Sequence, residues 1–311
     1  MKLIHSKTII MRLFSALFVL LFAGTFSGWA QYTETINSNR PGESQGAFAV
    51  GTGVIQIESG ITMGKDKHEL LMTESNLYGL DYAFRYGFFK EELEISLMGS
   101  FLYDKTKMTI GATEEDFVRS NFDSNTLGAK YLVYDPYKKG EDPINIRSWK
   151  ANRRFKWKTL IPAVSVYAGA NFYFGDNAFM QEDEGMISPR VAVITQNNWG
   201  RWVFVMNIIG DKITEEFPTY AGIFTMTHSV NPNFSVFGEY QVIKSDIYSD
   251  NIARGGAAYL FSDNFQVDAS VLFNFKDTPS RWQIGAGVSY RIDLHSEDVI
   301  LEDNNVGGNK S

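Results

Sequence analysis

The chain has 311 residues, no cysteine, a formal net charge of −7 and an aromatic content of 14%. The lack of cysteine excludes disulfides, thiol catalysis and a lipid anchor on a cysteine, and the acidic balance argues against nucleic acid as a partner. The mean hydropathy is slightly negative, which is unusual for a helical membrane protein but is expected for a membrane β-barrel, in which only alternate residues face lipid.

The first 30 residues have the pattern of a secretory signal peptide. Basic residues between Lys2 and Arg12 precede an apolar run from Leu13 to Phe22, and small residues follow up to Ala30. We expect cleavage after Ala30, which leaves a mature chain long enough for one large all-β domain. A transmembrane anchor is the alternative for this segment, but Gly24 interrupts the apolar run and counts against it.

A polar segment without periodicity, residues 31–47, follows the signal peptide. We predict that it forms an arm that lies either in the periplasm or in the lumen of the barrel described next. The two placements differ in their consequence for function, because an arm inside the bore would obstruct passive diffusion.

Residues 48–294 are predicted to form an all-β, antiparallel, up-and-down transmembrane β-barrel of about twelve strands. In residues 265–275 and Trp282–Ile292, apolar side chains alternate with polar ones and aromatic residues lie near the strand ends. A period of two places the apolar set on one face of a sheet, and terminal aromatics are typical of the girdles of a lipid-facing barrel. We expect Trp282–Ile292 to close the barrel against Gly53–Met63. Residues 295–311 form a polar C-terminal tail.

The predicted connections differ between the two ends of the barrel. Short ones, such as residues 89–91 and 262–264, fall on the side of the N-terminus, and longer polar ones, such as Asp104–Asn125, fall on the other side. Outer-membrane barrels have short periplasmic turns and longer outer loops, so the pattern predicts the outer membrane of a Gram-negative bacterium. A soluble β-sandwich is the alternative fold, but its strands average about 5 to 6 residues and have no reason for paired aromatic ends.

Charged residues with the parity of the barrel interior are the candidate lining of a lumen. They are Glu58, Asp81, Arg85, Glu94, Lys130, Arg190, Glu239, Arg254, Asp268 and Arg291. One interpretation is a charge-lined channel for a small polar or amphipathic solute. The other is a paired network that fills and stiffens a narrow barrel, because buried charges need partners. Acidic and basic residues are equally numerous, which argues against a strongly ion-selective pore.

One connection on the periplasmic side is long and basic. Its positive residues include Arg147, Lys150, Arg153, Arg154, Lys156 and Lys158. They form either a solvated loop or a docking surface for an acidic periplasmic partner or for lipid headgroups, with Trp149 and Trp157 as interfacial anchors. The docking interpretation suggests a barrel that serves as a subunit of a larger envelope assembly.

Enzymatic function is not expected. The mature chain has three histidines, His68, His228 and His295. The first and last lie in polar connections, and a serine next to His228 in sequence does not make a catalytic triad, which depends on geometry. Metal-binding spacings, phosphate-binding glycine loops and nucleotide motifs are absent from the sequence, so we expect no cofactor and no metal.

Three short stretches carry a family likeness: NRPGE at residues 39–43, GVIQIESG at residues 53–60 and FGEY at residues 237–240. Together with the barrel pattern they resemble the transporter-like outer-membrane family named for the meta-pathway of phenol degradation. The resemblance implies a channel or transporter for small solutes, including hydrophobic or aromatic ones. The polar tail after the last strand departs from the terminal aromatic that such barrels usually carry. A non-conducting structural or assembly subunit of an outer-membrane complex is the alternative function.

Overall fold

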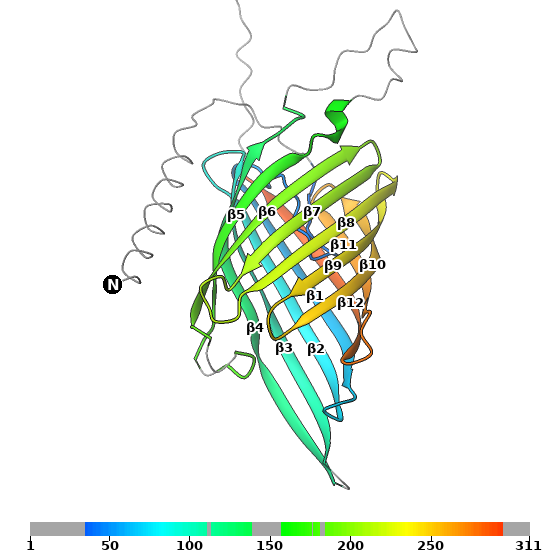
Figure 1. Cartoon of the computed structure of the whole chain (residues 1–311). Coiled ribbons are helices and arrows are strands. Elements are labelled where there is room, and N and C mark those ends of the chain that lie inside the picture. Colours follow the sequence, from blue (N-terminus) through cyan, green and yellow to red (C-terminus); the bar gives the residue numbers. More distant parts are fainter. Residues whose placement is uncertain (1–34, 111–112, 139–156, 176, 181–183, 295–311) are drawn as a thin grey trace, which may run out of the picture. The chain divides into compact units, whose positions relative to one another are not determined.

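The structure is a computed structural model, and it describes residues 35–110, 113–138, 157–175, 177–180 and 184–294. Twelve antiparallel strands form a closed barrel in which each strand pairs with the next and β12 pairs with β1 (Figure 1). The strands are β1 (Val54–His68), β2 (Thr73–Gly87), β3 (Leu93–Ile110), β4 (Thr113–Tyr134), β5 (Ala163–Phe172), β6 (Ile187–Trp199), β7 (Trp202–Asp211), β8 (Thr219–Asn231), β9 (Phe234–Lys244), β10 (Ser249–Ser262), β11 (Phe265–Asn274) and β12 (Ser280–Asp293). The predicted fold class and strand number are confirmed.

Side-chain alternation explains why these segments form a barrel wall. Large apolar residues such as Ile61, Tyr78 and Val271 are between 52% and 60% exposed on the outside, whereas polar residues of the other parity are buried. Leu272 breaks the alternation in β11, and it faces inward at 8% exposure. An apolar exterior on a closed sheet suits lipid, because every backbone group of the wall is paired within the sheet.

The register of β1 against β12 confirms the expected closure. The pairs run from Val54 opposite Asp293 to Lys67 opposite Ser280. The closing ladder is therefore longer than the predicted one, because both strands continue beyond their apolar parts. We call the end of the barrel where β1 begins the turn end and the opposite end the loop end.

The prediction of a long polar loop at Asp104–Asn125 is wrong. β3 and β4 continue through most of this stretch and pair as far as Ile110 opposite Thr113, and their hairpin reaches beyond the other strands in Figure 1. Lys105 and Asp116 form an ion pair of 3.0 Å across it. Residues 113–120 of β4 are exposed at both parities, so the apolar alternation that marks a lipid-facing strand is missing although the backbone pairing continues.

The only helix in the described residues is a 3-10 turn, η1 (Trp157–Leu160). None of the helices described is long and apolar enough to cross a membrane.

Candidate functional site: the barrel interior

The segment before β1, residues 35–53, lies against inward-facing side chains of the barrel, and we call it the arm. Gln45 forms two hydrogen bonds with the amide side chain of Asn207: its backbone N donates at 2.7 Å and its carbonyl accepts at 2.9 Å. Ala47 donates to the side chain of Gln196 at 2.9 Å and accepts from the hydroxyl of Ser165. These wall residues satisfy an irregular backbone that the barrel shields from water.

An apolar cluster surrounds the arm at the same level. Ala47 is fully buried there, and Phe48 packs against the cluster. The wall contributes Leu132, Ala163, Tyr167, Ala192, Ile194, Ile209 and Ile223. These side chains pack around Ala47, which has no exposed surface, so water is excluded from this part of the arm. The sequence shows a signal for this cluster, because residues 191–194 of β6 are apolar at both parities and not only on the lipid-facing side.

Four of the predicted interior charges form one buried cluster next to the arm. Arg85 binds Glu94 through two nitrogens, each at 2.9 Å, and Glu58 at 3.0 Å. Lys130 contacts Glu94 at 3.3 Å and donates to the carbonyls of Gly46 at 2.9 Å and Phe48 at 3.0 Å. All four of these charged residues are at most 2% exposed. The cluster both fills this part of the barrel and anchors the arm.

A second anchor is Arg40, which the sequence did not single out as an interior residue. Its guanidinium donates two hydrogen bonds of 3.2 Å to Asp268 and lies 3.9 Å from Asp81. Gly60 and Gly287, which are opposite each other on β1 and β12, leave the flat space that the guanidinium occupies, since a Cβ on either glycine would collide with it. Arg40 belongs to the NRPGE stretch that carries the family likeness, but its position inside the barrel was not predicted.

Glu239 of β9 is a third anchor and binds the turn of the arm. Its carboxylate accepts hydrogen bonds from the backbone of Glu43 at 3.1 Å and Ser44 at 3.3 Å, and from the hydroxyl of Thr225 at 2.8 Å. Arg254 forms an ion pair with the same carboxylate. A carboxylate that accepts several such bonds fixes the arm firmly, because charge-assisted hydrogen bonds are about twice as strong as neutral ones.

Substituting Gly60→Ala should loosen the arm. The new methyl group displaces the Arg40 guanidinium from Asp268, so we expect faster amide hydrogen exchange in residues 38–48 with unchanged exchange in the strands. Gly238→Ala is the matched control, because nothing lies within 4 Å of a Cβ at that glycine. Equal exchange in the two variants would show that the slot around Arg40 does not hold the arm.

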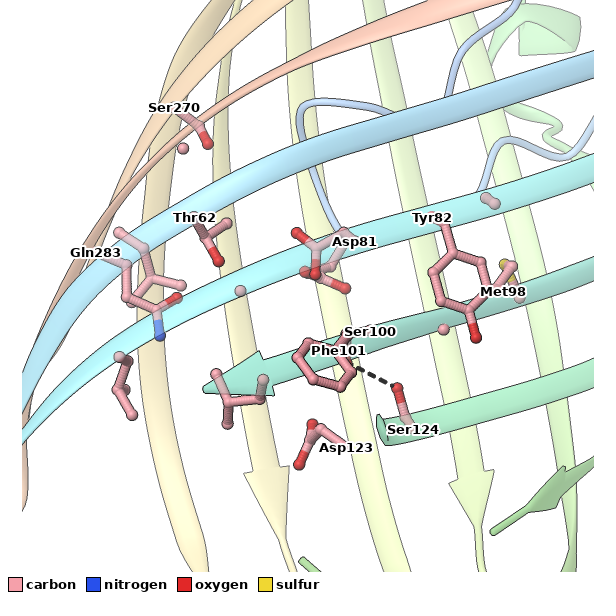
Figure 2. Close-up of a pocket in the computed structure, with 18 of the residues that line it drawn as sticks. Thr62, Asp81, Tyr82, Met98, Ser100, Phe101, Asp123, Ser124, Ser270 and Gln283 are labelled. Atoms are coloured by element: carbon pink, nitrogen blue, oxygen red, sulfur yellow. Dashed lines mark hydrogen bonds between the residues drawn. The ribbon is translucent and has the colours of Figure 1, made fainter. Parts of the chain in front are cut away.

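A cavity of about 620 Å³ lies on the loop side of the arm, and the turn of the arm from Asn39 to Gln45 forms part of its lining. Figure 2 shows Asp81, Ser100 and Gln283 among the polar side chains that line it. Among the predicted interior charges, Glu58, Asp81, Arg190 and Arg254 line this cavity. The interior is thus divided into a plugged part and a polar cavity.

The remaining sequence-predicted residues lie apart from these anchors. Arg190 is 3.7 Å from Asp211, and Arg291 forms an ion pair of 3.1 Å with Asp293, near the end of β12. In the basic connection, Lys158 belongs to η1. Residues 1–34, the tail 295–311 and the basic residues Arg147, Lys150, Arg153, Arg154 and Lys156 lie outside the described residues.

The fold and the interior define a class: a closed twelve-stranded barrel with a lipid-compatible exterior, a polar cavity and an internal plug. The chain belongs to the family described as "Putative MetA-pathway of phenol degradation", which matches residues 38–292. The resemblance inferred from the short stretches is therefore confirmed. No curated protein matches the chain.

Several solved structures share the barrel architecture. An outer membrane channel from Pseudomonas putida F1 has 11% sequence identity and a TM-score of 0.48, over 82% of this chain and all of that chain (100%). The translocator domain of the autotransporter NalP from Neisseria meningitidis has 9% identity and a TM-score of 0.46, over 78% and 89%. The Pseudomonas putida toluene transporter TodX has 8% identity and a TM-score of 0.44, over 86% and 98%.

Proposed function

We propose that this protein is an outer-membrane channel for small solutes, and that its own arm closes it at rest. The observation that carries the proposal is the polar cavity of about 620 Å³ that ends on the arm inside a closed barrel. A barrel that served only as a scaffold would have no need of such a cavity. The arm makes passive diffusion through the described conformation unfavourable, so passage requires the arm to move.

The membrane placement in this proposal follows from the barrel wall. A large exposed apolar surface is unfavourable in water. A closed sheet with an apolar exterior is instead one of the two kinds of structure that can span lipid. The short turns at the turn end then face the periplasm, and the arm enters the barrel from that side. β4 ends and β5 begins at the same end, and we propose the basic connection between them as a surface for lipid headgroups or a periplasmic protein.

Planar-bilayer recordings of the full-length protein test the channel. We expect the native protein to be closed for most of the time, and the double variant Arg40→Ala, Glu239→Gln to conduct steadily, because it loses two anchors of the arm. Heat-modifiable migration on gels checks that both proteins are folded barrels. Folded protein that never conducts in either form would refute the channel and support the non-conducting subunit of an envelope complex.

A further inference from the structure

We infer that the solute which the cavity accepts is hydrophilic and donates hydrogen bonds through hydroxyl or ammonium groups, and is not an aromatic hydrocarbon. The inference rests on the proposed function and names its solute class. It comes from the chemistry of the cavity wall, which departs from what the family description suggests.

Hydroxyl and amide groups line the cavity on several strands. Figure 2 shows Thr62 of β1, Ser100 of β3, Ser124 of β4, Ser270 of β11 and Gln283 of β12 around it. Apolar and aromatic residues, among them Tyr82, Met98, Phe101 and Phe179, also line the cavity, but the polar part of the lining surface is the larger one. A hydrocarbon in this cavity would remove water from these groups without replacing its hydrogen bonds, which is unfavourable.

The arginines at the cavity already have acidic partners. Arg281 donates to Asp66 at 2.6 Å, and Arg119 pairs with Asp104. Arg254 pairs with Glu239 and Arg40 with Asp268, as described above, while Arg190 lies 3.7 Å from Asp211. A solute that offered only an acceptor, such as a carboxylate or sulfonate, would have to compete with these internal carboxylates.

Two carboxylates at the cavity have no such close pairing. The nearest cation to Asp81 is Arg40 at 3.9 Å, and Arg40 is already bound to Asp268. Asp123 lies beside the hydroxyl of Ser100, and no ion pair joins it to a lysine or arginine in the described part of the chain. An ionised carboxylate only accepts hydrogen bonds, so the groups that remain open to a solute call for a donor. Hydroxyl and ammonium groups share this chemistry.

The size of the cavity agrees with a small solute that keeps part of its water. A volume of about 620 Å³ is within the range of about 300 to 1,000 Å³ that small-molecule sites occupy. Water can bridge the solute to wall groups that it does not reach directly. A monosaccharide or a small amine fits this description.

Thiol protection tests the inference in the full-length barrel, because the chain has no cysteine. Ser270→Cys places one thiol in the cavity wall, and Glu115→Cys places one on the exposed β3–β4 hairpin as the control. We measure the rate of labelling by a small hydrophilic thiol reagent with ethanolamine, glucose or toluene present. Glucose or ethanolamine should slow labelling of the first variant severalfold, toluene should leave it unchanged, and the control should respond to none of them.

The outcomes separate the possible solutes. Protection by ethanolamine alone assigns an ammonium group, and protection by glucose alone assigns a polyol. Asp81→Asn with Asp123→Asn should abolish ethanolamine protection, and its persistence would overturn the role of the two carboxylates. Protection by toluene, or by no compound, overturns the inference, and Thr62→Cys provides a second wall position if Ser270→Cys does not fold. Labelling from the loop end requires no passage, so this result is independent of the conductance that tests the channel itself.

Discussion

A disulfide between positions 44 and 225 should hold the channel shut until it is reduced. The hydroxyl oxygens of Ser44, on the arm, and Thr225, on β8, are 2.7 Å apart, and both residues are buried. Their side chains are therefore close enough for a bridge between cysteines at the same positions. We expect Ser44→Cys with Thr225→Cys, combined with Arg40→Ala, to give no current when oxidised and to conduct after a reducing agent is added.

Single-channel recording compares the current of the same protein before and after reduction, so no difference in sequence enters the comparison. Ser44→Cys alone, also in the Arg40→Ala background, is the control, and its current should not respond to the reducing agent. If the oxidised double-cysteine protein conducted as well as the reduced one, solute would pass without movement of this part of the arm. The arm would then not be the gate.

Replacing Arg85 should cause the largest loss of stability in the barrel. Its guanidinium is fully buried between Glu58 and Glu94 and also donates to the carbonyl of Asn37 at 2.7 Å. Arg85→Met removes the only cation bound to Glu58 in the described residues and leaves Glu94 with Lys130 alone as its cationic partner. Breaking a buried ion pair by removing one partner typically costs about 3 to 5 kcal/mol, so we expect a loss of that size in the free energy of unfolding, measured by urea titration in lipid vesicles.

An exposed pair supplies the control for this measurement. Lys65 and Glu74 form an ion pair of 3.0 Å, with side chains that are 48% and 49% exposed. Lys65→Ala should cost no more than about 1 kcal/mol, the usual upper value for surface pairs. Arg85→Lys should fall between these variants, because it keeps the charge but not the two-nitrogen contact with Glu94. A loss for Arg85→Met no larger than that of Lys65→Ala would mean that water reaches the cluster.

The barrel was predictable from the sequence because lipid imposes a strict alternation on each strand. Residues 265–275 and Trp282–Ile292 show that alternation clearly, and the structure has β11 and β12 there. Prediction failed where the contrast between lipid and water ended. Around Lys105 and Asp116 the hairpin extends into water, so its side chains do not alternate between apolar and polar. Backbone pairing alone leaves no periodic pattern in the sequence, and the strands were therefore predicted as a loop.

Parity placed charges such as Arg85, Glu94 and Lys130 on the inward face, where the structure buries them, but it missed Arg40 and Asp104 and did not show what each charge contacts. The pairing of Arg85 with Glu58 and Glu94 depends on the registers β1–β2 and β2–β3, and a shift in either register would change the partners. The role of Arg40 depends on contacts with strands far away in sequence, since Asp268 follows it by 228 residues. Local patterns contain no information about such distances.

For this protein the sequence by itself determined the closed sheet, its apolar exterior and the inward parity of charges such as Arg85 and Glu94, because these follow from the alternation of neighbouring residues. The tertiary structure alone decided that the arm lies against the inner wall of the barrel, that Arg40, Glu239 and Lys130 hold it there, and that a polar cavity remains beside it. The arm has no periodicity, and its position results from hydrogen bonds to side chains on all twelve strands, which only the closed barrel brings together.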